Sequence, residues 1–156
     1  MDKNQKVKIV EVDNLNSTLN ELVDQLDSYL DGLYPGVDRG IRDLSKTKCL
    51  LIYMDGVVAA CGGWKKYADK VAEVAVIFTK PKFRRLGLAE TMIVEIERIV
   101  KAQNYHTLVL YTGFKQTAAI KLYEKLGFKK MRQNYPPYQN LTSVVCMSKS
   151  TLLQLL

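Results

Sequence analysis

Apolar residues recur along the chain with two different spacings, which predict an alternation of strands and helices. Residues 6–12 alternate as in a short strand. Residues 14–33 predict a helix, because their apolar positions recur three and four residues apart and Asn16 or Ser17 can cap its start. These apolar positions are Leu19, Leu22, Val23, Leu26, Tyr29, Leu30 and Leu33. Tyr34-Pro35-Gly36 is expected to end this helix.

Two apolar runs in the middle of the chain predict a β-hairpin. They cover residues 49–54 and 57–64 and are separated by Asp55-Gly56, which suits a type I′ turn because both of its central positions need positive φ. A third strand over residues 71–79 is expected after a loop at residues 65–70. This part of the chain therefore predicts an antiparallel meander.

The second half of the chain returns to helical spacing. A helix is expected from Leu88 to Asn104, followed by a strand over residues 107–112. The resulting strand–helix–strand unit should be parallel and right-handed. A further helix over residues 116–126 is stopped by Gly127, and final strands near residues 128–132 and 141–148 flank the loop Tyr135-Pro136-Pro137-Tyr138. Together these elements predict an α+β fold.

Length and composition limit the chain to one core. Its 156 residues, of which 47% are hydrophobic, suffice for a single domain over residues 1–156. The chain lacks a run of about 18 apolar residues and begins with polar ones, which argues against a membrane span or a secretory signal. We therefore expect a cytoplasmic protein without a membrane partner.

Charge narrows the expected partners. The formal net charge of +7 favours nucleic acid or a polyphosphate cofactor, although a charged surface also serves solubility alone. Basic residues are scattered, except at residues 80–85, where Lys80, Lys82, Arg84 and Arg85 gather. This clustering favours the cofactor, so no nucleic-acid partner is expected.

Metal and disulfide chemistry are not expected. Cys49, Cys61 and Cys146 lie in apolar segments and form no Cys-x-x-Cys pair, which fits reduced, buried thiols. His106 is the only histidine, so it lacks the company that a metal site or a catalytic triad needs. A structural role is therefore favoured for His106.

The turn at residues 84–89 is the strongest candidate for a binding site. It joins an apolar strand to the helix that begins near Leu88, through Arg84, Arg85 and Gly87. A helix start has unpaired N–H groups and partial positive charge, a small residue lets an anion approach, and arginines add charge-assisted contacts. A phosphorylated cofactor fits this turn. A plain helix entry with a solvated arginine pair is the alternative.

Two motifs in this order resemble the GNAT acetyltransferase superfamily. The first is Arg84-x-x-Gly87-x-Ala89 at the strand-to-helix turn. The second, about thirty residues downstream, is Gln116-x-x-Ala119-x-x-Leu122-Tyr123-Glu124-Lys125-Leu126-Gly127-Phe128. Members commonly carry glycine directly after the first arginine, where this chain has Arg85. Segments similar to a small-molecule subgroup are Cys61-Gly62-Gly63-Trp64, Ala72-Glu73, Tyr111-Thr112-Gly113 and residues 135–138.

The resemblance implies an α/β/α fold with a mixed, mostly antiparallel central sheet of about six or seven strands flanked by helices. It implies acetyl-CoA as co-substrate and no metal. The turn would hold the pyrophosphate. The strand before it, splayed by a bulge, would pair with the pantetheine arm, and a backbone N–H there would polarise the thioester carbonyl. The implied cofactor-binding residues are Ile77, Phe78, Thr79, Arg84, Arg85, Leu86, Gly87, Leu88, Ala89, Gln116 and Ala119.

Two residues are candidates for proton transfer. The tyrosine that matches Tyr123 protonates the departing thiolate in many relatives, and a phenol with a pKa near 10 can serve a thiol near 8.5. Tyr123 also lies in an apolar helical stripe, so a plain core role stays open. Glu73 would deprotonate the acceptor amine, directly or through water, because some relatives keep a glutamate there. A solvated strand carboxylate is the alternative for Glu73.

The resemblance implies an N-acetyltransferase that acts on the amine of a small molecule or an amino-acid-like acceptor. Direct transfer in a ternary complex is expected, because no cysteine has a histidine nearby in sequence. Acceptor contacts are expected from the loops at residues 34–36 and 135–138. A protein or peptide acceptor and a non-catalytic acyl-CoA-binding module are the alternatives. A homodimer is left open.

Overall fold

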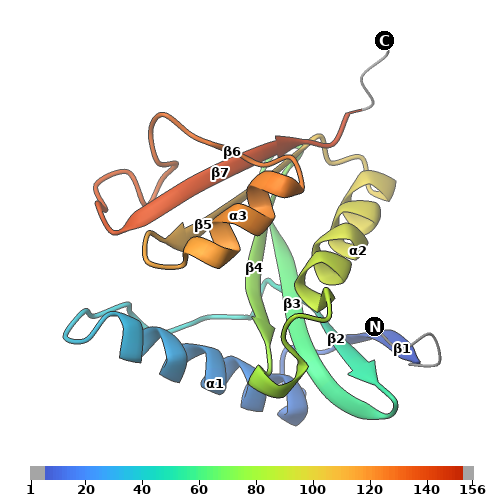
Figure 1. Cartoon of the computed structure of the whole chain (residues 1–156). Coiled ribbons are helices and arrows are strands. Elements are labelled where there is room, and N and C mark those ends of the chain that lie inside the picture. The colour runs from blue at the N-terminus through green and yellow to red at the C-terminus, as the bar shows by residue number, and fades with distance from the viewer. Residues whose placement is uncertain (1–5, 153–156) are drawn as a thin grey trace. The chain divides into compact units, whose positions relative to one another are not determined.

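The computed structural model describes residues 6–152, which form two compact units. Within this range the first unit contains residues 6–65 and 74–96, and the second contains residues 66–73 and 97–152. Figure 1 labels the helices and strands of both units. One strand, β4 (Val71–Thr79), and one helix, α2 (Leu88–Ala102), contribute residues to both units. The expectation of one domain over the whole chain stays a prediction.

The first unit contains most of the predicted meander. Its elements are β1 (Val7–Val12), α1 (Ser17–Leu33), β2 (Lys48–Met54), most of β3 (Val57–Ala68), the later part of β4, the 3-10 helix η1 (Pro81–Phe83) and the first part of α2. β1 and β3 both run antiparallel to β2. Asp55 and Gly56 have φ of 49° and 81°, which confirms the predicted hairpin turn. Asn16 caps α1, because its side chain accepts a hydrogen bond from the Leu19 N–H at 2.9 Å.

Different helices cover the two faces of the strands in this unit. Cys61 of β3 and Phe78 of β4 belong to one buried cluster with Leu22 of α1. Gly62, the next residue along β3, faces Met92 of α2, because a Cβ added to Gly62 would come within 2.4 Å of the Met92 Cγ. Successive residues of a strand point to opposite faces of a sheet. Helix α1 therefore covers one face and α2 the other.

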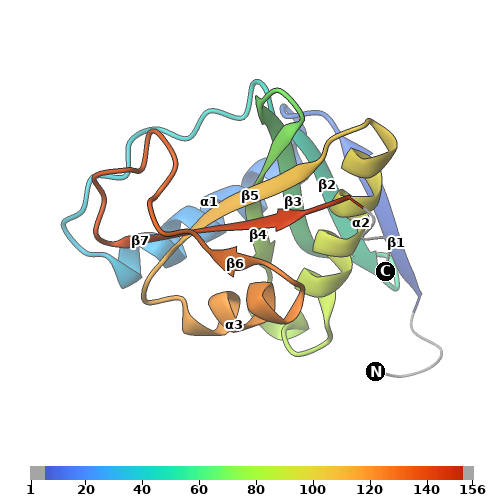
Figure 2. The same cartoon turned by 90° about the horizontal axis from the view of Figure 1, so that it is seen from above.

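The second unit contains the remaining strands. Its elements are the start of β4, the end of α2, β5 (Thr107–Gly113), α3 (Thr117–Lys125), β6 (Lys129–Lys130) and β7 (Val144–Ser150). Residues 71–73 of β4 run parallel to residues 107–109 of β5, as the strand–helix–strand pattern predicts. β7 lies between β5 and β6 and is antiparallel to both (Figure 2). Val109, Tyr135 and Cys146 form a buried cluster of this unit.

Strand pairing through β4 produces one seven-stranded sheet in the order β1-β2-β3-β4-β5-β7-β6. The β4–β5 pair is parallel, whereas β1–β2, β2–β3, β5–β7 and β6–β7 are antiparallel. The predicted fold, a mixed and mostly antiparallel sheet flanked by helices, is therefore confirmed. Across residues 6–152, no helix combines the length and the apolar character that crossing a membrane requires.

Some predicted boundaries are wrong. Residues 65–70 are not a loop, because β3 continues to Ala68 and only Asp69 and Lys70 make the turn, with Lys70 at φ 61°. The strand expected at residues 128–132 shrinks to the two residues of β6, and the last strand begins at Val144 instead of residue 141. In these places pairing with another strand, which local sequence does not report, decides where a strand starts and stops.

The cysteines are free and buried, as predicted. Burial raises the pKa of the Cys49 thiol to about 11 and that of the Cys61 thiol to about 12. Burial also raises the pKa of Cys146. All three thiols are therefore protonated at neutral pH, which makes them poor nucleophiles.

Candidate active site

The turn between β4 and α2 has a backbone whose φ angles alternate in sign. Arg84 has φ −71°, whereas Arg85 and Gly87 have φ of 66° and 76° with Leu86 between them outside the positive region. Such alternation directs successive N–H groups to a common side and forms a concave nest for an anion. Gly87 adopts positive φ freely, whereas Arg85 does so against its Cβ. The conformation of Arg85 therefore explains why glycine suits that position.

Helix α2 adds donors beside this nest. The Thr91 N–H donates to the Gly87 carbonyl at 3.0 Å and closes the first helical turn, so the N–H groups of Leu88 and Ala89 have no acceptor within the helix. The positive end of the helix dipole favours an anion at the same place. A Cβ added to Gly87 would meet no atom within 4 Å, so the space around it is open. This donor set fits the phosphate groups of a coenzyme A ligand.

The two arginines of the turn have different surroundings. Arg84 Nε donates to the Thr79 carbonyl at 3.3 Å, and its guanidinium lies 5.5 Å from the Tyr29 ring centroid and 5.9 Å from that of Phe78. Arg84 therefore ties the turn to α1 and β4. The side chain of Arg85 is exposed and makes no polar contact within residues 6–152. Arg85 is thus the arginine available to a phosphate.

The end of β4 directs alternate backbone groups to opposite edges. The Lys80 N–H donates to the Ala59 carbonyl of β3 at 2.8 Å. Phe78, two residues earlier, therefore also directs its N–H and carbonyl toward β3, whereas Ile77 and Thr79 direct theirs to the other edge. The predicted pairing of the pantetheine arm with this strand stays a prediction. Phe78 contributes its ring to the core under α1.

Glu73 lies in the second unit and is only 3% exposed. The Tyr135 hydroxyl donates to Glu73 Oε2 at 2.7 Å, and the Tyr135 ring packs edge-on against Tyr67 and Tyr138 at centroid distances of 5.0 and 5.3 Å. Burial, reinforced by the bond to Glu73, raises the pKa of Tyr135 well above its usual range, so its hydroxyl stays a donor. The alternative of a solvated carboxylate at residue 73 is therefore wrong.

The loop that carries Tyr135 is held by side chains that sequence reasoning missed. Asn134 Nδ2 donates to the carbonyls of Tyr138, Leu141 and Val144 at 3.2, 3.0 and 3.2 Å. The Tyr67 hydroxyl donates to the Pro136 carbonyl at 2.6 Å, across 69 residues of sequence. The turn residues in this loop were a usable signal for Asn134, whereas no local pattern could have pointed to Tyr67.

Tyr123 lies on α3 with its side chain buried, in edge contact with Phe128 at a centroid distance of 6.0 Å. Burial raises the pKa of Tyr123 to about 12. Its hydroxyl has no hydrogen-bond partner in the described part of the chain. The predicted role of Tyr123 in proton transfer stays a prediction.

Gln116 and Ala119 occupy the start of α3. Gln116 Oε1 accepts hydrogen bonds from the Thr112 hydroxyl and from the Gly113 N–H, both at 3.0 Å. The Gln116 side chain therefore closes the turn between β5 and α3. Ala119 is half-buried one turn further along this helix. Their predicted role in cofactor binding stays a prediction.

Turns of this kind occur in more than one protein family, and the comparison with family models identifies the family of this chain. The model of the acetyltransferase (GNAT) family matches residues 15–128, which include both motifs. The chain belongs to the GNAT family. It is an acyl-CoA-dependent acetyltransferase.

Individual relatives of this acetyltransferase agree with the family. IAA acetyltransferase of Azospirillum brasilense is 29% identical over 138 residues, which cover 85% of this chain and 90% of that protein. A crystal structure from Klebsiella pneumoniae, described as an acyl-CoA N-acyltransferase, has a TM-score of 0.81 at 25% identity and covers 94% of this chain and 98% of that one. A GNAT acetyltransferase from Elizabethkingia anophelis with acetyl-CoA bound has a TM-score of 0.69 at 15% identity, covering 92% and 97%.

An open groove lies between α1 and the turn of this acetyltransferase. Its volume is about 370 Å³, and it is lined by Asp24, Gln25, Ser28, Tyr29, Phe78, Pro81 and Arg84. Sequence reasoning gave none of the four α1 residues a binding role, because Tyr29 was counted in the apolar stripe of the helix and Asp24, Gln25 and Ser28 fell outside it. The structure leaves all four exposed.

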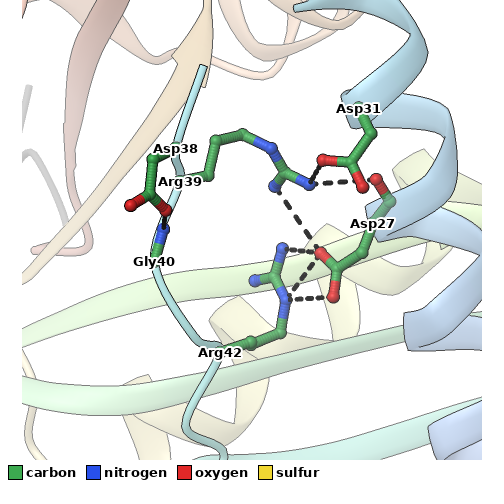
Figure 3. A network of polar contacts seen from close by, with 6 residues as sticks. All are labelled: Asp27, Asp31, Asp38, Arg39, Gly40 and Arg42. Atoms are coloured by element: carbon green, nitrogen blue, oxygen red, sulfur yellow. Dashed lines mark hydrogen bonds and ion pairs between the residues drawn. The ribbon is translucent and has the colours of Figure 1, made fainter. Parts of the chain in front are cut away.

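The segment after α1 in the acetyltransferase is fastened to that helix by an ionic network (Figure 3). Arg42 binds Asp27 through Nη2 and Nε, at 2.6 and 3.0 Å from Oδ1. Arg39 binds Asp31 at 2.7 Å and also donates to the Asp27 backbone carbonyl at 2.9 Å. The network lies between α1 and the segment that follows the predicted acceptor loop at residues 34–36. This anchor was also missed, because its pairs are 8 and 15 residues apart in sequence.

Within each unit the GNAT acetyltransferase brings some predicted residues together. Residues 77–79 and 84–89 lie in the first unit, where Arg84 links the turn directly to Thr79. Glu73, Gln116, Ala119 and Tyr123 lie in the second unit, where Glu73 meets the aromatic loop through Tyr135. The predicted phosphate site and the predicted proton-transfer residues therefore belong to different units.

Proposed function

We propose that this acetyltransferase moves the acetyl group of acetyl-CoA to the amine of a small molecule or an amino-acid-like acceptor, by direct transfer in a ternary complex. The observation that carries the proposal is the turn at residues 84–89. Its alternating φ angles, with Arg85 at 66° and Gly87 at 76°, form an anion nest at the start of α2. A polyphosphate ligand is what such a nest and a free arginine would recognise.

Each part of the cofactor has a counterpart in the first unit. The N–H groups around Gly87 and the Arg85 side chain would bind the phosphates. The edge formed by Ile77 and Thr79 would pair with the pantetheine amides, as one strand pairs with another. An N–H on this edge would donate to the thioester oxygen, where negative charge grows during attack by the amine.

Tyr123 supports loss of the thiolate in this proposal. Direct transfer forms a C–N bond and breaks the C–S bond, so the sulfur gains a proton while the amine nitrogen loses one. Because burial raises the Tyr123 pKa to about 12, complete transfer to a thiolate of pKa about 8.5 would be uphill by about 5 kcal/mol. Tyr123 therefore acts first as a hydrogen-bond donor to the sulfur as charge develops, with complete transfer later.

Glu73 takes up the proton of the acceptor amine in this proposal. Its carboxylate is buried and holds the Tyr135 hydroxyl, so the proton would arrive through an intervening water molecule. The protonated cysteines support direct transfer. Burial raises the pKa of the Cys61 thiol to about 12, so the nucleophilic thiolate form is not populated at neutral pH.

A small acceptor is favoured over a lysine-rich protein tail. The net charge of +7 would repel such a tail. The groove beside Phe78, with a volume of about 370 Å³, also matches a small ligand in size. The second candidate, a peptide or protein acceptor, would need an acidic or neutral segment around the modified amine.

The test is a thiol-release assay with acetyl-CoA and a panel of small amines, amino acids and neutral and acidic peptides. We expect release with one or more small amines, and a Tyr123→Phe variant that loses about 10- to 100-fold in kcat with nearly unchanged coenzyme A affinity. Release only with peptides would replace the small acceptor. Tight binding of acetyl-CoA without release for any amine would instead indicate an acyl-CoA-binding module.

A further inference from the structure

Strand β4 contains a kink at Val76. Its φ is 51°, in the left-handed region that β-branched residues rarely adopt, and it lies in the middle of the strand. Val76 is only 5% exposed, so solvent does not relieve this conformation. Such a residue keeps positive φ only where its surroundings hold it there. The neighbours of Val76 must therefore stabilise this backbone conformation.

The Cys61 thiol of β3 contacts the backbone at the kink and directly after it. Its Sγ–H donates to the Val76 carbonyl at 3.3 Å. The Phe78 N–H lies against the same sulfur and lowers the thiol pKa slightly, whereas burial is the dominant influence and raises it to about 12. The thiol therefore stays protonated, and its bond to Val76 persists across the working pH range.

Two glycines beside Cys61 make room for the kinked strand. A Cβ on Gly62 would lie 2.9 Å from the Ile77 Cδ1 and 2.4 Å from the Met92 Cγ. A Cβ on Gly63 would lie 2.9 Å from the Lys48 carbonyl oxygen and 3.4 Å from the Val76 Cγ2. No larger residue fits at either place without movement of its neighbours. The segment Cys61-Gly62-Gly63 therefore leaves room for residues 76–78 to pack closely against β3.

The kink decides which backbone groups reach the outer edge of β4. Phe78 and Lys80 face β3, and Lys80 bonds to the Ala59 carbonyl at 2.8 Å. Ile77, directly after the kink, faces the opposite edge. A residue in the left-handed region bends the strand and changes the direction of the groups that follow it. The orientation of the Ile77 N–H therefore depends on the conformation of Val76.

We propose that Cys61 is a positioning residue of this acetyltransferase, whose thiol fixes the Val76 kink and thereby aims the Ile77 N–H at the thioester oxygen. The inference rests on the proposed function, in which the cofactor arm lies along this edge. Cys61 does not touch the reacting atoms. It acts through Val76. In the sequence, the segment Cys61-Gly62-Gly63 is the feature that points to this role, although the same residues are also typical of an ordinary core strand.

The test compares Cys61→Ala with Cys61→Ser, and uses Cys49→Ala as a matched control. Cys49 is equally buried in β2 and belongs to the same cluster, but its thiol donates to the Thr47 carbonyl at 3.7 Å and not to Val76. Serine restores a donor at residue 61, whereas alanine does not. We expect kcat to fall about tenfold in Cys61→Ala, because a displacement well under 1 Å of a reacting group already reduces rate. Cys61→Ser should recover most of that loss, and Cys49→Ala should keep the wild-type kcat.

Two further measurements separate positioning from loss of packing. Coenzyme A affinity should be the same in all variants, because the turn at residues 84–89 binds the phosphates. The carbon chemical shifts of Val76, which report its backbone conformation, should change in Cys61→Ala and not in Cys49→Ala. A Cys61→Ala variant with wild-type kcat and unchanged Val76 shifts would overturn the inference. If the wild-type protein releases no thiol with any amine, the proposed function fails, and the Val76 shifts still decide whether Cys61 holds the kink.

Discussion

Replacing Gly87 by alanine isolates the role of its backbone conformation. Gly87 has φ 76°, and an added Cβ would meet no atom within 4 Å, so the substitution introduces backbone strain without a clash. Left-handed φ costs an alanine about 1–2 kcal/mol relative to glycine. If the free turn relaxes to negative φ, the anion nest opens, and binding must restore it at that cost. The expected rise in the coenzyme A dissociation constant is about 5- to 30-fold.

A matched control exists in the same unit. Gly36 has φ 77° and equally open surroundings, but it lies in the loop after α1. Gly36→Ala should carry the same strain and leave coenzyme A affinity unchanged. The melting temperature should fall in both variants by no more than about 8 °C, since a chain of this size loses about 2–4 °C per kcal/mol.

Isothermal titration of both variants with coenzyme A, beside thermal unfolding, provides the measurement. Equal affinity of Gly87→Ala and Gly36→Ala would show that positive φ at the turn does not matter for binding. In that case the phosphate site would not lie at residues 84–89. A weaker affinity in both variants would instead indicate a general loss of structure in the first unit.

Three more substitutions test separate contacts. Arg85→Gly should raise the free energy of unfolding by about 1 kcal/mol, because it removes strain at φ 66°, while it weakens coenzyme A binding and the salt dependence of that binding. Asp27→Asn removes the carboxylate that Arg39 and Arg42 share. It should lower the free energy of unfolding by about 0.5–1 kcal/mol in denaturant titrations at low salt. Tyr135→Phe removes the hydroxyl that donates to the buried Glu73 carboxylate and should lower the free energy of unfolding by about 1–3 kcal/mol.

Each substitution has a control close by. Arg85→Ala removes the charge and keeps the strain, so a gain in stability there would contradict the backbone explanation. Asp31→Asn breaks a pair whose carboxylate is far more exposed and should have little effect. Tyr67→Phe removes a more exposed hydroxyl from the same aromatic cluster, and a loss as large as that of Tyr135→Phe would refute the special weight given to the bond with Glu73.

Much of the first unit followed from short-range patterns. Asn16 was one of two predicted caps and does cap α1, because a cap depends only on the next three residues. Asp55-Gly56 makes the predicted turn, since positive φ is a property of those residues themselves. Gly87 was likewise placed correctly in a helix-entry turn. Local conformational preference is a property of sequence, so sequence alone could reveal it.

The features around the candidate site were decided at long range. The bond between Tyr135 and Glu73 spans 62 residues, and Glu73 is buried, whereas the sequence left a solvated carboxylate open as an alternative. β3 extends to Ala68 because its backbone pairs with another strand, whereas the polar side chains at this end of β3 predicted a loop. The kink at Val76 runs against the preference of valine, so no local rule could predict its position.

The sequence by itself determined the strand and helix periods, the turn at residues 84–89 and the family motifs, because each depends on neighbouring residues or on a short spacing. The tertiary structure alone decided that Glu73 is buried, that Arg84 faces α1 while Arg85 stays exposed, and that Cys61 reaches the Val76 carbonyl. These contacts join residues far apart in the chain. These contacts stabilise the protein only after the sheet has formed. Their free energy then outweighs the local conformational preferences that oppose them.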